Sequence, residues 1–215
     1  MKSVYIVGGG NSLKDFDFNK LKDKETIVIN KSIFAVSDPT YFITCDYSFL
    51  IKIKAQSLFN KFQKMNTPKI FILQSYLPYL KEDKGRTIDI RYKNYIYDLK
   101  DFDIIIKSYK AEGVGLKWND FRNGINSGIC AIQYAILMGY TDIYLLGIDL
   151  KLCNKRSHFH NGYGEEKNVF AKKLDQYFSY YKIMFKEIIK NNPNINIYSS
   201  SKDSRLNCFI PYKEI

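Results

Sequence analysis

The stretch from residue 125 to 150, INSGICAIQYAILMGYTDIYLLGIDL, constrains the fold of this chain more than any other. Its first half carries apolar residues at the spacing of one helix face, at Ile129, Ile132, Ala135, Ile136 and Met138. Asn126 and Ser127 precede this run, where side-chain oxygens cap a helix and the free N–H groups of the first turn attract anions. Gly139 follows the run and favours the end of a helix. We therefore expect a helix between these two signals.

The second half of the same stretch predicts a buried strand. Residues 143–146 are almost wholly apolar and lead directly into Gly147 and Asp149. Such a run is typical of a strand that is covered on both faces of a parallel sheet. Ligands of open α/β sheets bind beyond the carboxyl ends of the strands. Gly147 and Asp149 are therefore candidate ligand-binding residues, although spacing alone favours an aspartate that only caps a helix or turn.

A glycine turn follows the first predicted strand, which covers residues 3–7. The turn consists of Gly8, Gly9, Gly10, Asn11 and Ser12. Glycines permit positive φ and let the backbone approach a phosphate closely, so this turn is a candidate nucleotide site. It does not match the dinucleotide fingerprint, because Leu13 occupies the third glycine position and Asn30 stands where an acid would hold the ribose. The turn also lacks the GK[ST] ending of a P-loop, which disfavours both NAD enzymes and P-loop NTPases; a tight turn without a ligand remains open.

Further apolar runs indicate one α/β domain that covers residues 1–215. They predict strands at residues 26–30, 41–44, 70–73 and 195–198, and helices at residues 47–64 and 165–192. The expected fold is a single Rossmann-like domain with a mostly parallel central sheet and helices on both faces. Two of these strands end in polar residues, Asn30 and Asp46, which adds them to the candidate site. Residues 76–122 contain no motif that we can place.

The only two histidines, His158 and His160, lie in one polar, glycine-flanked segment just after Asp149. We expect this segment to form a short loop or lid around residues 151–166. A histidine accepts a proton from a hydroxyl near neutral pH, so the pair predicts a general base. A metal-binding role and a simple loop role remain alternatives, with no third metal ligand evident nearby.

The charged residues do not by themselves identify a partner. The net charge is +11, but the lysines are dispersed along the chain, which gives only weak support for anionic partners and none for nucleic acid. The acidic pairs at residues 15–17 and 101–103 favour helix or turn caps over a metal site. The cluster of Ser199, Ser200, Ser201, Ser204 and Arg205 allows either an anion site or a solvated turn.

The cysteines and the hydropathy of the chain indicate its cellular compartment. Its four cysteines are scattered and predict reduced thiols. No apolar run approaches a membrane span of about 20 residues, and the sequence begins directly with a strand pattern, so we expect a cytoplasmic protein.

Four segments together resemble the bacterial family 42 sialyltransferases. They are GGGNSL at residues 8–13, Asn30, INSG at 125–128 and LLGIDL at 145–150. They resemble as closely a broader set of bacterial and phage proteins, including relatives of the archaeal-type 6-hydroxymethylpterin pyrophosphokinases and the motility accessory factors. The resemblance implies a cytidine nucleotide bound at the glycine turn, Asn30 and Ser127-Gly128.

In the sialyltransferases a histidine beyond the GID turn deprotonates the acceptor hydroxyl without a metal. The resemblance implies that role for His160 or His158. Those enzymes carry a longer lid before the histidine, with tyrosines that touch the donor phosphate. Here only about ten residues intervene, and Tyr163 follows the histidines. This departure leaves the identity of the donor open.

We therefore expect an inverting, metal-independent glycosyltransferase that needs no cofactor. It would move a sugar, with sialic acid from a CMP donor as one candidate, to a hydroxyl of a glycan or another acceptor. The expected nucleotide-binding residues are Gly8, Gly9, Gly10, Asn11, Ser12, Asn30, Asp46, Ser127, Gly128, Gly147 and Asp149, and the expected catalytic residues are His160 and His158. One alternative is a pyrophosphokinase that uses ATP and Mg²⁺, with Asp46 and Asp149 as ligands. Another is a non-catalytic nucleotide- or nucleic-acid-binding protein; peripheral association with a membrane surface and oligomerisation are also left open.

Overall fold

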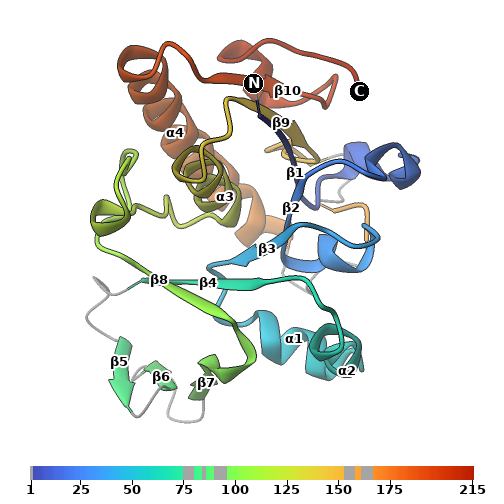
Figure 1. Cartoon of the computed structure of the whole chain (residues 1–215), viewed down its shortest axis with the longest axis vertical. Helices are drawn as coiled ribbons and strands as arrows, with labels where there is room; N and C mark the ends of the chain where they lie inside the picture. Colours follow the sequence, from blue (N-terminus) through green and yellow to red (C-terminus); the bar gives the residue numbers. More distant parts are fainter. Residues whose placement is uncertain (1, 75–79, 84–85, 90–95, 153–157, 161–166) are drawn as a thin grey trace.

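The computed structural model describes residues 2–74, 80–83, 86–89, 96–152, 158–160 and 167–215 (Figure 1). Its main feature is a seven-stranded sheet in which every neighbouring pair is parallel. In spatial order the strands are β10 (Asn196–Ser199), β9 (Asp142–Leu146), β1 (Ser3–Val7), β2 (Thr26–Ile29), β3 (Tyr41–Thr44), β4 (Lys69–Gln74) and β8 (Ile104–Ser108). The expected parallel α/β fold is thereby confirmed.

The strand order reverses beside β1. From β1 the chain moves outward through β2, β3, β4 and β8, and then returns to place β9 on the other side of β1. Val7, the last residue of β1, is in register with Leu146, the last residue of β9. The two turns that follow these strands therefore leave the sheet side by side. In an open parallel sheet this reversal is the place where a ligand is expected.

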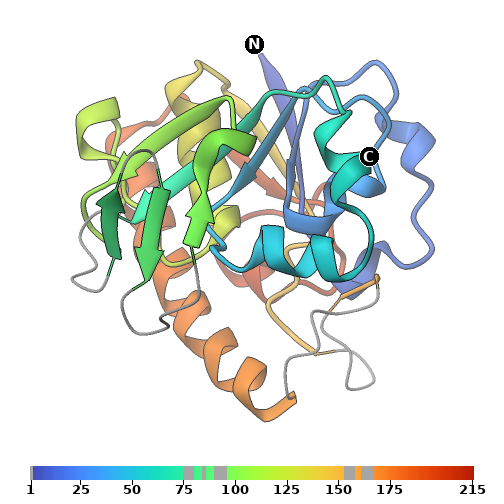
Figure 2. The same ribbon diagram turned by 90° about the horizontal axis from the view of Figure 1, so that it is seen from below.

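Helices cover both faces of the sheet, as predicted (Figure 1). One face packs against α3 (Ser127–Leu137) and α4 (Lys167–Asn191). The other face packs against α1 (Phe49–Ala55) and α2 (Phe59–Gln63). Figure 2 shows the N-terminal end of α4 projecting away from the sheet.

The buried strands owe their place to their apolar residues. All five residues of β9 are buried, which confirms the strand predicted from the apolar run. In β1, Val4 and Ile6 point into the cluster under α3 and α4, whereas Val7 points into the cluster under α1 and α2. Each such side chain stabilises the fold by about 1.5–3 kcal/mol relative to an exposed one.

Short 3-10 helices fill several connections. They are η1 (Asn11–Leu13), η2 (Phe18–Leu21), η3 (Asn30–Phe34), η4 (Leu99–Asp101), η5 (Trp118–Asp120) and η6 (Arg205–Cys208). Asp17 caps η2 by accepting a hydrogen bond from the Asn19 N–H at 3.0 Å, which confirms a capping role for the first acidic pair. The same prediction is wrong for Asp103. Its carboxylate accepts from the Lys69 N–H at 2.7 Å and so ties β8 to the start of β4.

The structure corrects the sequence interpretation at two further places. The helix expected at residues 47–64 is two helices, because Ser57 takes a positive φ of 56° between α1 and α2. The region without a recognisable motif contains β8 and a separate antiparallel sheet of β5 (Leu80–Asp83), β6 (Arg86–Asp89) and β7 (Ile96–Asp98). Among the described residues no helix is both long and apolar enough to cross a bilayer.

Candidate functional site

The glycine turn after β1 and the turn after β9 are bonded to each other. We call residues 8–12 and 147–149 together the glycine junction. The Gly10 N–H donates to the Gly147 carbonyl at 2.7 Å, so the two turns continue the pairing of their strands. The predicted nucleotide-binding residues of both turns are thus brought together by backbone contacts of the protein itself.

The glycines of the junction are needed for this close approach. A Cβ on Gly8 would lie 2.5 Å from the Gly147 carbonyl oxygen, and a Cβ on Gly10 would lie 2.5 Å from Asp149 Oδ2. A positive φ was expected in the first turn but belongs to Gly147, at 62°. The room that Gly8 and Gly10 leave is therefore occupied by the second turn.

Asp149 has its carboxylate engaged inside the protein. It is 4% exposed and accepts two hydrogen bonds from Ser12, one from the N–H at 2.8 Å and one from the hydroxyl at 2.6 Å. The Ser12 hydroxyl also lies 2.9 Å from Ser201 Oγ, which accepts from the Gly147 N–H at 3.1 Å. Asp149 and Ser12 therefore hold the two turns of the glycine junction together through these hydrogen bonds.

Both histidines lie on the glycine turn. Phe159 donates its N–H to the Gly9 carbonyl at 3.0 Å, and His158 forms an isolated bridge with Gly10. A Cβ on Gly9 would lie 2.6 Å from His158 Cδ2 and 3.0 Å from His160 Nε2. The two imidazoles are stacked, with centroids 4.9 Å apart and an interplanar angle of 25°. Because glycine has no side chain, Gly9 leaves room for both imidazoles.

The environment of His158 disfavours its protonated form. Burial is the largest cause, followed by the positive charges of His160, Lys31 and Lys52, and together they lower its pKa from 6.5 to about 4. His158 is therefore neutral at pH 7. A general base works best with a pKa near the working pH, so this environment makes His158 a weak base in the ligand-free protein.

A polar network occupies the carboxyl ends of β2 and β3. The Thr44 hydroxyl donates to Asn30 Oδ1 at 2.7 Å and accepts from the Asp46 N–H at 3.0 Å. Asn30 has a positive φ of 52°, a conformation that asparagine tolerates better than most residues. The predicted site residues Asn30 and Asp46 are therefore joined through Thr44.

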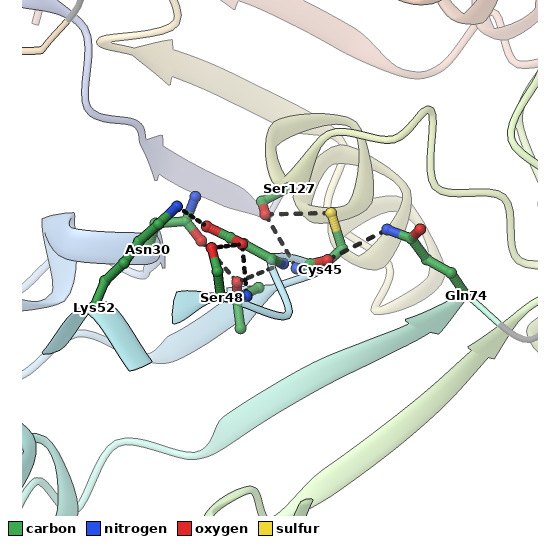
Figure 3. A network of polar contacts seen from close by, with 8 residues as sticks. Asn30, Cys45, Ser48, Lys52, Gln74 and Ser127 are labelled. Atoms are coloured by element: carbon green, nitrogen blue, oxygen red, sulfur yellow. Dashed lines mark hydrogen bonds and ion pairs between the residues drawn. The ribbon is translucent and has the colours of Figure 1, made fainter. Parts of the chain in front are cut away.

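The network continues from β3 to the start of α3 and to β4 (Figure 3). The Cys45 N–H donates to Ser127 Oγ at 3.1 Å, and Gln74 Nε2 donates to the Cys45 carbonyl at 3.3 Å. The expected helix cap is confirmed, because Asn126 Oδ1 accepts from the Gly128 N–H at 2.8 Å. Ser127 thus lies at the same edge of the sheet as Asn30 and Asp46.

Gly128 lies at the N-terminal end of α3 but is closed in by α4. A Cβ there would collide with the hydroxyl of Tyr181, which is fully buried. Tyr181 in turn donates to Asn126 Oδ1 at 3.0 Å. The glycine is therefore explained by the packing of α3 against α4.

Basic side chains gather beside the glycine turn. We call Lys31, Lys52, His158 and His160 the basic corner. Lys31 follows Asn30 and is 6% exposed; burial and the charge of Lys52 lower its pKa. Figure 3 shows Lys52 beside Asn30, across the polar network from Gln74. These side chains come from η3, α1 and the segment after β9, so only the fold brings them together.

Asp46 is the acidic neighbour of this corner. Its Oδ1 accepts from the Ser48 N–H at 2.9 Å and from the Ser48 hydroxyl at 2.7 Å. Its Oδ2 lies 3.2 Å from Lys52 Nζ in a half-buried ion pair. Asp46 therefore places Lys52 and orders the first turn of α1.

The predicted site residues form two groups that touch. Gly8 to Ser12, Gly147, Asp149 and the two histidines form one group, and Asn30, Asp46 and Ser127 form the other. The Ser32 hydroxyl joins them by donating to the Gly8 carbonyl at 2.6 Å. Sequence reasoning missed Lys31, Ser32, Thr44 and Lys52. Lys31 and Ser32 could have been found from their place directly after Asn30, whereas Lys52 carries no local signal.

Other predictions on metal and anion sites have mixed outcomes. Within the described part of the chain, no group of three or more His, Cys, Asp or Glu residues could hold a metal ion. The C-terminal cluster bonds to the protein: the Ser204 hydroxyl donates to the Ile148 carbonyl at 2.8 Å, and Arg205 pairs with Asp175 at 2.8 Å. Most of the expected lid, including Tyr163 and Cys153, lies outside the described residues. The thiols of Cys45, Cys130 and Cys208 are free, as expected.

Comparison with known proteins gives a structural likeness but no sequence match. No model of a protein family matches the chain, and no curated protein matches it. The sialyltransferase CstII from Campylobacter jejuni in complex with CMP-3FNeuAc matches 99% of this chain and 86% of its own, with 20% identity and a TM-score of 0.56. CST-II in complex with a trisaccharide acceptor and CMP matches 98% of this chain and 86% of its own, with the same identity and TM-score.

A third structure extends the likeness. The monofunctional alpha-2,3-sialyltransferase Cst-I from Campylobacter jejuni matches 99% of this chain and 80% of its own, with 17% identity and a TM-score of 0.56. The likeness covers nearly the whole chain in each case. This chain therefore shares the fold of these sialyltransferases.

Proposed function

We propose that this protein is a sialyltransferase-like glycosyltransferase, which moves a sugar from a nucleotide donor to a hydroxyl acceptor. The observation that carries the proposal is the stacking of His158 and His160 on Gly9, at the point where the strand order reverses. A base is thereby held at the edge of the sheet where a substrate is expected. The shared fold with the Campylobacter jejuni enzymes, one of them solved with CMP and a trisaccharide acceptor, supports the same assignment.

The nucleotide would bind across the carboxyl ends of β1, β2 and β3. The polar groups available there are the Gly9 turn, Asn30, Asp46 and Ser127. Ser127 lies in the first turn of α3, where the helix dipole favours a negative charge. Asp149 and Gly128 support this surface by fixing the turns, as their internal contacts indicate.

His160 is the proposed general base. It would take the proton of the acceptor hydroxyl while that oxygen forms a bond to the anomeric carbon of the donor sugar. The bond from that carbon to the phosphate oxygen breaks, and the nucleotide leaves with the bonding electron pair. Attack from the side opposite the leaving group inverts the anomeric configuration. His158 ranks second, and its pKa, lowered to about 4 mainly by burial, makes it a weak base.

The direct test is an assay of nucleotide release with a donor panel. CMP-sialic acid and UDP- and GDP-sugars are incubated with the protein and a trisaccharide acceptor, and both the free nucleotide and the glycosylated product are measured. We expect product only with an accepted donor and acceptor together. In parallel, a bound nucleotide at 100 times its Kd should stabilise the fold by about 2.7 kcal/mol in a thermal-shift experiment. A protein that binds none of these nucleotides and forms no product would contradict the proposal.

A further inference from the structure

The basic corner unites basic side chains from three separate parts of the chain. Lys31 belongs to η3, Lys52 to α1, and the imidazoles to the segment that lies on Gly9. Lys31 is 6% exposed, and lysines buried to this degree, such as Lys69 at 7%, are found almost only where the charge has a partner. Lys52 is held in place by Asp46 at 3.2 Å, with 20% of its side chain accessible. One lysine is therefore enclosed and the other is fixed but reachable.

This arrangement costs free energy in the ligand-free protein. Like charges that approach in a partly buried region repel each other, and burial removes their hydration. Both effects act on two side chains of the corner. The pKa of Lys31 is lowered by burial and by Lys52, and the pKa of His158 is lowered by burial and by the neighbouring basic groups. An anion at this place would offset the repulsion and form charge-assisted hydrogen bonds.

We propose that Lys31 and Lys52 form an anion-binding subsite that holds a phosphate or carboxylate group of the substrate next to the glycine turn. This inference rests on the proposed function and specifies it, because it requires a substrate with a negative group close to the base. The nucleotide phosphate and an acidic sugar are the two sources of such a group. Both present oxygens that the ammonium groups bind in the same way.

The subsite is tested by separating the anionic group from the rest of the substrate. Isothermal titration is performed with cytidine, CMP, inorganic phosphate and N-acetylneuraminic acid. The variants are Lys31→Met and Lys52→Met, which keep the length of the side chain and remove its charge. Lys54→Met is the matched control, because Lys54 is exposed on the same helix as Lys52 and contacts the Phe59 ring. Lys52→Arg retains the charge and should retain binding.

We expect the charge-removing variants to bind the anionic probe about tenfold to hundredfold more weakly, as is typical for the loss of a hydrogen bond to a charged group. Cytidine affinity and the Lys54→Met control should change less than about twofold. A loss confined to CMP and phosphate identifies a phosphate subsite, and a loss confined to N-acetylneuraminic acid identifies a carboxylate subsite. Circular dichroism shows whether each variant is folded. If Lys31→Met does not fold, the binding test is made with Lys52→Met alone.

The failures of this inference and of the proposed function are distinguishable. If CMP binds the wild type and both lysine variants within about twofold of each other, the subsite is overturned and the nucleotide site remains. If CMP does not bind but another anionic probe does, and the lysine variants lose it, the subsite stands and the cytidine donor is wrong. If no anionic probe binds the wild type, the subsite is overturned as well.

A spectroscopic readout separates binding from a structural role of the lysines. The chain has only two histidines, so the imidazole resonances of His158 and His160 can be followed individually by NMR. An anion between the lysines should raise the pKa of His158 above about 4, since it offsets the effect of Lys31 and Lys52. Two carboxylates lie nearby with and without the anion. Asp46 is bound to Lys52, and Asp149 is bound to Ser12. A His158 pKa that is unchanged at saturating ligand would contradict a subsite next to the imidazoles.

Discussion

The glycine junction and the basic corner lie side by side but are built in opposite ways. In the junction, polar groups of the protein satisfy one another: Ser12 donates twice to Asp149, and Gly10 donates to Gly147. In the corner, basic groups are buried close to one another, and burial first and neighbouring positive charge second lower the pKa values of Lys31 and His158. The first region satisfies its polar groups internally, whereas the second is the proposed anion subsite.

This difference separates the scaffold from the binding surface. The residues that most resemble a nucleotide motif, Gly8, Gly10 and Asp149, mainly hold two turns together. The residues of the proposed anion subsite, Lys31 and Lys52, belong to no motif. The comparison predicts that variants of the junction lose stability, whereas variants of the corner lose binding or turnover.

The largest effect is expected for the base. His160→Ala should lower kcat by about 10²- to 10⁴-fold, because a positioned general base contributes that much to the rate. Thermal stability and nucleotide affinity should change little by comparison. Steady-state kinetics with the accepted donor measures the effect, and the pH profile of kcat/KM of the wild type should fall on the acid side. Near-full turnover in both His160→Ala and His158→Ala would remove the catalytic assignment.

The junction is tested by Asp149→Ala. The variant leaves the N–H and hydroxyl of Ser12 without their carboxylate, and we expect a loss of about 3 kcal/mol in the free energy of unfolding. Denaturant titration measures the loss. Asp203→Ala is the control, since the Asp203 side chain is 79% exposed, and it should change stability by less than about 0.5 kcal/mol. An Asp149→Ala protein of normal stability that no longer binds nucleotide would reverse the division between scaffold and binding surface.

A smaller effect is expected from acid. The pKa of His158 is about 4 in the folded protein and near 6.5 when unfolded, so the unfolded chain binds more protons between these values. The free energy of unfolding should therefore rise with pH across this window and be lower at pH 4 than at pH 7, by on the order of 2–3 kcal/mol from this group. His158→Gln should remove that part of the slope. Parallel stability curves for wild type and variant would show that His158 is not the titrating group.

The smallest effect is expected from removal of metal. EDTA should leave turnover within about twofold, because a histidine and fixed basic groups handle the proton and the charge in the proposed reaction. The assay is repeated with EDTA and with added Mg²⁺. Activity that vanishes with EDTA and returns with Mg²⁺ would favour the pyrophosphokinase alternative, with Asp46 and Asp149 released from their present contacts.

The parallel core could be predicted because its signals are local. The run at residues 143–146 is almost wholly apolar, and the helix before it ends at Leu137, two residues before Gly139, whose φ of 82° suits glycine. β8 was missed because it is an edge strand with Ile104 and Ile105 both about two-fifths exposed, at 41% and 38%. The break at Ser57 was missed because neither glycine nor proline marks it. Tertiary context decides such positions.

The candidate site could be predicted only in part, for the same reason. The strand ends and the histidine segment were visible, since polar residues directly follow apolar runs. The pairing of Asp149 with Ser12 was not visible, because it joins residues 137 positions apart. The approach of Lys52 to Lys31 depends on where α1 packs, which no spacing in the sequence encodes. Only the folded chain brings these basic side chains together.

The long separation between the two turns of the glycine junction has a consequence for synthesis. β1 can pair with β2 as soon as both have left the ribosome, but its other edge waits for β9, and the Ser12–Asp149 contact spans 137 residues. Until then an apolar strand of the interior of the future sheet has an unpaired edge, which is a site for aggregation. The glycine junction, and with it the proposed substrate site, therefore forms only after most of the polypeptide has been made. A truncated product that ends before residue 142 would lack half of the glycine junction and both histidines.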